Sequence, residues 1–185
     1  LLDEIAELHE RGIDSSHLGV SSRCHLIMPY HPVQDRLEET GRGAANIGTT
    51  QRGNGPCYAD KAARRGIRAA DIVDPEYLRA RLEPVLKEKN ALLGALYGHP
   101  PFDLDEMAEQ FAAYGEQLAP YITDVELDIQ DAIDDGRNVM IEGAQAAMLD
   151  IDYGTYPFVT SSSPTAAGVC QGAGVAPTQV DRVIG

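Results

Sequence analysis

The residues from Gly43 to Gly66 combine glycines, hydroxyl groups and positive charge in a way that suits the binding of an anion. Glycines let backbone N–H groups approach an anion closely, and the hydroxyls of Thr49 and Thr50 add hydrogen-bond donors. The pair Gly55-Pro56 is typical of a helix start, and a helix N-terminus favours negative charge. These features predict a site for a phosphate-bearing ligand. The stretch is not a Walker A loop, because no Lys-Ser/Thr pair follows its last glycine.

Positive charge gathers in the same region. Six basic residues and one acidic residue lie between Arg42 and Arg68, although the chain has a formal net charge of −14. If the segment is helical, cations spaced by three and four residues share one side of it, namely Lys61, Arg64 or Arg65, and Arg68. The alternative is that the glycines serve turns and the cations form a solvated face near a helix C-terminus. The scarcity of acids favours positioned charges.

A second candidate segment follows a short apolar run, residues 139–141, that we expect to form a buried strand. Polar side chains just beyond such a strand lie at the carboxyl end of the sheet, where open α/β proteins bind ligands. Gln145 can both donate and accept, which suits a nucleobase, although a loop glutamine in water is the alternative. Asp150 and Asp152 could ligate a metal or cap a turn.

The third candidate is a cluster of hydroxyls from Thr160 to Ser163, followed by small residues over 166–174. Such a cluster could bind a ligand, or it could cap a helix that begins near Pro164. His25 and His31 lie on or beside an apolar run, where we expect histidines satisfied within the core. The spacing supports no Ser-His-Asp set and no cluster of metal ligands.

These candidates must be positioned by strands and helices that alternate along the chain. Apolar runs predict strands at residues 24–31, at 139–141 and at the closing run QVDRVIG. Helical spacing and capping residues predict helices over 1–12, 32–43, 74–98, about 103–122 and about 124–135, with a kink or restart at Pro84. The fold class expected is α/β, with a partial, largely parallel sheet, flanking helices and a helical excursion at about 75–135.

Composition bounds the class of protein. The 185 residues suit one domain, and 43% apolar with 24% charged residues is typical of a soluble globular chain. No apolar run approaches the roughly 18 residues of a membrane helix, so we expect a cytoplasmic protein with no membrane partner. The negative charge argues against nucleic acid. The three cysteines are expected to be reduced, and both ends of the chain look cut.

The stretches IGTTQRGNGPCYADKAARRG and EGAQAAMLDIDYGTYPFVTSSSPTAAG, in this order, closely resemble the central portion of the adenylosuccinate synthetase family. The resemblance covers essentially the whole chain. It implies an α/β homodimer and a GTP-dependent carbon–nitrogen ligase that joins IMP to aspartate in purine (AMP) biosynthesis. The implied chemistry is phosphoryl transfer from GTP to the purine oxygen, followed by attack of the aspartate amine and loss of phosphate. GTP and Mg²⁺ are the implied cofactors.

The resemblance also implies roles for single residues. Thr50 would bind the IMP phosphate, and Arg64 would reach across the dimer interface to the IMP phosphate of the other subunit. Gln145 and Thr160 match positions that contact IMP, and Lys61 matches the family's signature lysine, to which we assign a catalytic role.

The chain also departs from the family. Gln51 stands where the family often has glycine or a basic residue, and Asn54 where it usually has isoleucine. The family's N-terminal phosphate loop with its catalytic aspartate, its nearby catalytic histidine, its aspartate-binding loop and its guanine-recognition segment do not occur here. We therefore interpret residues 1–185 as one internal, IMP-binding and dimer-forming fragment that is inactive alone and binds neither GTP nor Mg²⁺. The alternative is a stand-alone nucleotide-phosphate-binding or dimerisation module without catalysis.

Overall fold

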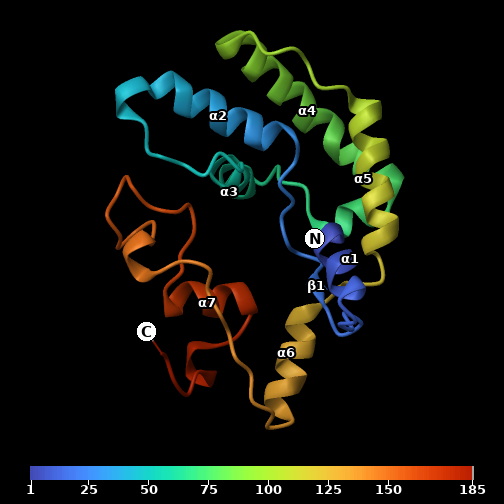
Figure 1. Cartoon of the computed structure of the whole chain (residues 1–185), viewed down its shortest axis with the longest axis vertical. Coiled ribbons are helices and arrows are strands. Elements are labelled where there is room, and N and C mark those ends of the chain that lie inside the picture. The colour runs from blue at the N-terminus through green and yellow to red at the C-terminus, as the bar shows by residue number, and fades with distance from the viewer. Residues whose placement is uncertain (185) are drawn as a thin grey trace. The chain divides into compact units, whose positions relative to one another are not determined.

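The structure, a computed structural model, describes residues 1–184 (Figure 1). It contains two units, each made of two chain segments. Unit 1 comprises Leu1–Tyr30 and Ala63–Val125, and unit 2 comprises His31–Ala62 and Glu126–Gly185. No helix among the described residues has the length and apolar character needed to cross a membrane.

Unit 1 is mainly helical. Its elements are α1 (Leu2–Glu10), β1 (Val20–Ser21), η2 (Ala69–Val73), α4 (Pro75–Tyr97), α5 (Leu104–Leu118) and β2 (Ile122–Thr123). The Asp74 side chain accepts the N–H groups of Glu76 and Tyr77 at the start of α4, and Gly98 ends the helix with a φ of +66°. Both boundaries confirm the sequence prediction. The helix runs through Pro84 without restarting.

The core of unit 1 lies where α4, α5 and η2 pack together (Figure 1). The predicted apolar face of α4 is buried at five positions, Leu78, Leu82, Val85, Leu86 and Leu93. Leu96 was expected on that face but is 64% exposed, because it lies in the last turn of the helix. From α5, Met107 and Phe111 are buried as predicted.

The sheet is smaller than the sequence predicts. β1 and β2 form a two-stranded parallel sheet in which Val20 pairs with Ile122. The strand expected at residues 24–31 is reduced to a single antiparallel bridge between His25 and Arg68. The fold class is α/β with flanking helices, and the helical excursion at about 75–135 is confirmed.

Unit 2 consists of short helices joined by long loops. Its elements are α2 (Tyr30–Arg42), which begins at the end of the first segment of unit 1, η1 (Gly43–Ala45), α3 (Asn54–Ala62), α6 (Val125–Asp134), η3 (Ala147–Leu149), α7 (Ala166–Ala173) and η4 (Pro177–Gln179). The predicted helices at 32–43, from Gly55 and at about 124–135 correspond to α2, α3 and α6.

The strands predicted at residues 139–141 and in the closing run are absent from the described residues, and the last residue of that run, Gly185, lies outside them. Met140 is 86% exposed. An apolar run becomes a strand only when a neighbour completes its hydrogen bonds, and residues 1–184 supply none to residues 139–141.

Candidate functional site

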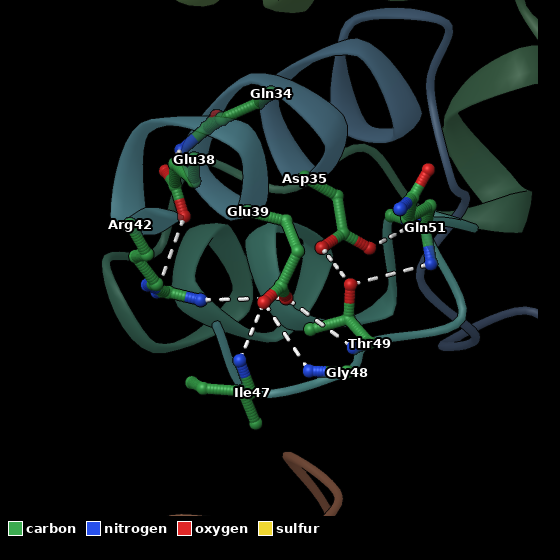
Figure 2. Close-up of polar contacts among 10 residues, drawn as sticks. Gln34, Asp35, Glu38, Glu39, Arg42, Ile47, Gly48, Thr49 and Gln51 are labelled. Carbon is green, nitrogen blue, oxygen red and sulfur yellow. Dashed lines mark hydrogen bonds and ion pairs between the residues drawn. The ribbon is translucent and has the colours of Figure 1, made fainter. Parts of the chain in front are cut away.

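The loop at residues 47–49 donates its backbone N–H groups to a carboxylate of the protein itself. Glu39 on α2 accepts hydrogen bonds from Ile47, Gly48 and Thr49, the last two at 3.2 Å (Figure 2). Three successive N–H groups that converge on one anion form a nest of the kind that elsewhere binds phosphate. Because Glu39 fills this nest, these amides are not available to a ligand. The expectation that bare amides of the glycine-rich loop hold a phosphate is wrong for these three groups.

A second carboxylate from the same helix anchors the far end of the loop. Asp35 accepts the Thr49 hydroxyl at 2.8 Å and the Gly53 N–H at 3.0 Å (Figure 2). Asp35 and Glu39 are four residues apart on α2, so they share a face, and each is only 6% exposed. Gly53 has a φ of +84°, and a Cβ there would lie 2.6 Å from the Pro32 nitrogen. This position therefore requires glycine.

The Glu39 carboxylate has a lowered pKa. Burial raises the pKa of this group, but the hydrogen bonds donated by the N–H groups of Thr49, Ile47 and Gly48 outweigh burial and hold it below the ordinary value of 4.5. Arg42 also lies 3.7 Å from this carboxylate. The ionised form of Glu39 is thus the form that the loop stabilises.

The lowered pKa predicts an acid-dependent loss of stability. Since the pKa is lower in the folded chain than in the unfolded one, the contribution of Glu39 is complete above about pH 4.5 and is lost as the pH falls through the lowered folded value. We expect Glu39→Gln to remove this pH-dependent contribution. The free energy of unfolding of the variant should therefore fall less between pH 7 and pH 3 than that of the parent. Urea unfolding at several pH values checks this, and parallel pH curves for the two proteins would contradict it.

Thr50 lies between these anchors and remains accessible. It is exposed, and within residues 1–184 its hydroxyl makes no hydrogen bond. The next residue, Gln51, has a φ of +56° and donates its N–H to the Thr49 hydroxyl at 3.3 Å. The loop therefore turns sharply at its outermost point and presents the Thr50 side chain to solvent.

The predicted row of cations along one helix is wrong. α3 ends at Ala62, and Arg64 follows in the left-handed backbone region with a φ of +63°. A residue other than glycine in this region interrupts a right-handed helix. Lys61 is thus the one residue of the row that lies on α3, while Arg65 forms an ion pair with Glu88 in unit 1.

Arg64 itself is exposed at this turn, and within residues 1–184 it forms no ion pair. Its unusual backbone holds the guanidinium outside any helix. It therefore remains available to a ligand or to another subunit.

Unit 2 contains a cavity of about 610 Å³ that brings two of the candidate segments together. Its walls come from α3, the hydroxyl cluster and α7, and its lining residues include Gly55, Lys61, Ser161, Ser162, Ser163 and Gln171. Lys61 is the single charged group among the described residues that line it. Thr160 adjoins this wall, with its hydroxyl 3.2 Å from that of Ser162. Apolar residues such as Tyr58 and Ile151 complete the lining, and the hydroxyls, the amide and the one ammonium group could hold an anionic group of a ligand.

Gln145 and the two aspartates lie outside the lining of this cavity. Gln145 is exposed in the loop that precedes η3. Asp150 accepts the N–H groups of Asp152 and Tyr153, so turn capping, one of the two alternatives from the sequence, is the role that the structure shows. Thr160 donates its N–H to the Leu149 carbonyl at 2.9 Å, which joins this turn to the hydroxyl cluster.

The most deeply buried polar pair of unit 2 lies between α2 and α3. His31 and Asp60 are both 0% exposed, and the His31 Nε2 lies 2.9 Å from the Asp60 carboxylate. His31 is therefore a satisfied core histidine, as predicted. The carboxylates at residues 35, 39 and 60 were missed by the sequence reading. The four-residue spacing of Asp35 and Glu39, just before a glycine-rich loop, is the sequence signal that could have indicated them.

The family model, the two relatives and the solved structure described next carry one name. A family model described as adenylosuccinate synthetase matches residues 1–185. Curated relatives with this name include those of Thermomicrobium roseum, 60% identical, and Oceanobacillus iheyensis, 50% identical; each match covers 100% of this chain, which spans only 43% of each relative. A solved structure, described as fully ligated adenylosuccinate synthetase from Plasmodium falciparum, matches with a TM-score of 0.83 and 32% identity, over 96% of this chain and 42% of that one.

Proposed function

Because the chain belongs to the adenylosuccinate synthetase family, we propose that residues 1–185 are one internal, IMP-binding and dimer-forming section of such an enzyme. The complete enzyme is a GTP-dependent carbon–nitrogen ligase that forms adenylosuccinate from IMP and L-aspartate in purine (AMP) biosynthesis, as a cytoplasmic homodimer. One observation carries this proposal: the relatives match this chain over its whole length, but the chain spans only 43% of their length.

Each candidate residue has a role in this proposal. The hydroxyls of Thr50 and Thr160 donate hydrogen bonds to the IMP phosphate, and Lys61 supplies positive charge at the adjoining cavity. Arg64 reaches the IMP phosphate of the other subunit, which its exposed position permits. Gln145 pairs with the purine base.

Mg²⁺ and GTP belong to other parts of the full-length enzyme in this proposal. Within residues 1–184, no group of three or more His, Cys, Asp or Glu side chains is arranged to hold a metal ion. When bound, Mg²⁺ neutralises the phosphates of GTP. We assign no step of the reaction to a metal held by this chain.

The chain then contributes binding and orientation to catalysis. Donors that fix the phosphate of IMP also fix the purine ring, so that its oxygen faces the transferred phosphoryl group and its carbon faces the aspartate amine. Lys61 keeps its proposed catalytic role, while the general base and the metal site come from the rest of the enzyme.

Because the proposed general base and metal site lie in the rest of the enzyme, we predict that the chain alone is inactive. Purified residues 1–185 should convert IMP, GTP and aspartate at no rate above the assay blank, because the proposed base and metal site lie elsewhere. A coupled phosphate-release assay checks this. Turnover that depends on all three substrates would contradict the prediction.

The role of Arg64 across subunits is testable by complementation. The T. roseum synthetase, with its matching segment replaced by this chain, provides a full-length host. In this chimera we expect Arg64→Leu to weaken IMP binding about 10- to 100-fold, the loss of one charge-assisted contact worth roughly 1.5–3 kcal/mol. Mixing it with a chimera inactivated outside this segment should partly restore activity, since mixed dimers contain one intact site. Absence of any restoration would contradict a shared site.

A second candidate is a stand-alone nucleotide-phosphate-binding or dimerisation module without catalysis. It is favoured by the fact that the cavity is built from unit 2 of this chain alone. Sedimentation of the isolated chain with and without IMP distinguishes a nucleotide-binding module from a pure dimerisation module. A pure dimerisation module associates to the same extent in both conditions.

A further inference from the structure

Two carboxylates of α2 hold the loop that carries Thr50 at both of its ends. Glu39 binds the N–H groups of residues 47–49, and Asp35 binds the Thr49 hydroxyl and the Gly53 N–H (Figure 2). The three residues between these anchors, 50–52, are exposed. The buried Asp35 and Glu39 carboxylates therefore set the conformation of residues 50–52.

Burying two carboxylates beside this loop costs free energy unless hydrogen bonds replace the water that they lose. Asp35 and Glu39 are each 6% exposed, so they lose most of their hydrogen bonds to water. Five hydrogen bonds donated by one short loop replace them. The Thr49 hydroxyl also accepts the N–H of Gln51, the residue with a φ of +56°. The contact thus extends from Asp35 through Thr49 to the strained turn beside Thr50.

We propose that Asp35 and Glu39 are positioning residues, which fix the Thr50 hydroxyl in the place where it meets the phosphate of the substrate. This inference rests on the proposed function of Thr50. Glu39 occupies the anion nest, so the loop recognises a phosphate through an outward side chain and not through the amides at residues 47–49. Asp35 and Glu39 themselves do not touch the substrate.

The test uses the full-length chimera with the T. roseum synthetase. Glu39→Gln keeps the size of the side chain but removes its charge and replaces one of the two acceptor oxygens with an NH2 donor, so that at least one of the three N–H groups faces a donor. Thr49→Val keeps the shape of its side chain but removes the hydroxyl that links Asp35 to Gln51. It serves as the second variant if Glu39→Gln fails to fold. Glu38→Gln is the matched control, because Glu38 lies on the same helix and contacts Gln34 and Arg42 but no loop residue.

We expect Glu39→Gln and Thr49→Val to raise the KM for IMP about tenfold or more, because a shift of about 1 Å in a group that contacts substrate costs up to roughly 100-fold. The KM for GTP should stay unchanged, as should both constants in the Glu38→Gln control. Combined with Thr50→Ala, neither variant should weaken IMP binding further, since each acts through Thr50.

Other results overturn the inference. If the effects of Thr49→Val and Thr50→Ala multiply, the anchors do not act through Thr50. An unchanged KM for IMP in both anchor variants has the same consequence, and so does an equal rise in the KM for GTP, which indicates a general structural role. If Thr50→Ala alone leaves IMP binding unchanged, the proposed function of Thr50 fails first, and the inference fails with it.

Discussion

Asp60→Ala is expected to lower the free energy of unfolding of the chain by about 3–5 kcal/mol, because removing one partner of a fully buried polar pair is strongly destabilising. Asp60 and His31 are both 0% exposed, with 2.9 Å between carboxylate and ring nitrogen. The pair joins α2 to α3, so its loss also loosens the helices on either side of the Thr50 loop. Since domains are stable by only about 5–15 kcal/mol, this loss is a large share of the total.

Urea unfolding followed by circular dichroism measures the effect. Glu88→Ala is the matched control, because Glu88 also pairs with a basic group, Arg65, but is 59% exposed. Surface ion pairs contribute about 0–1 kcal/mol, so the control should change stability by no more than that. A loss for Asp60→Ala as small as that of the control would show that the buried pair is not a principal stabilising contact of unit 2.

Gly115→Ala is expected to be destabilising by about 3 kcal/mol or more. A Cβ at Gly115 would lie 1.8 Å from the carbonyl oxygen of Ile72 and 2.6 Å from its carbon, both of which are backbone atoms. Backbone cannot swing aside as a flexible side chain does, so α5 would have to move away from η2. Overpacking in a core costs typically 1–3 kcal/mol and more where the neighbour is rigid.

Gly94→Ala is the matched control for this variant. Gly94 also lies within a helix, but its added Cβ would meet only the His99 carbonyl oxygen, at an ordinary 3.8 Å. Alanine is favoured over glycine in a helix by roughly 0.5–1 kcal/mol, so this variant should be slightly more stable than the parent. Equal stability changes at the two positions would contradict the close contact of α5 with η2.

The helices could be predicted from the sequence because their signals are local. Asp74 with Pro75, and Asp103, mark the starts of α4 and α5, and Gly98 marks the end of α4, as the structure shows. The strands could not be predicted with the same success, since an apolar run such as residues 139–141 becomes a strand only if a neighbour pairs with it. The end of α3 was missed for a related reason: nothing in the local pattern indicates that Arg64 takes a left-handed conformation.

The candidate site was predictable in part. The sequence indicated the Gly43–Gly66 segment and the hydroxyl cluster, and the structure places Lys61 and three serines of that cluster around one cavity. The sequence also suggested that the loop amides were free for an anion. Their actual partner, Glu39, lies eight to ten residues earlier in the chain, and the path of the loop back to α2 decides that contact.

The most direct test of the proposed nucleotide site is a crystal structure of the full-length chimera with IMP. IMP phosphate oxygens should lie about 3 Å from the hydroxyls of Thr50 and Thr160, with Arg64 of the partner subunit at the same phosphate. Glu39 should still accept the hydrogen bonds of the amides of residues 47–49. A phosphate bound away from both threonines would contradict the proposed nucleotide site.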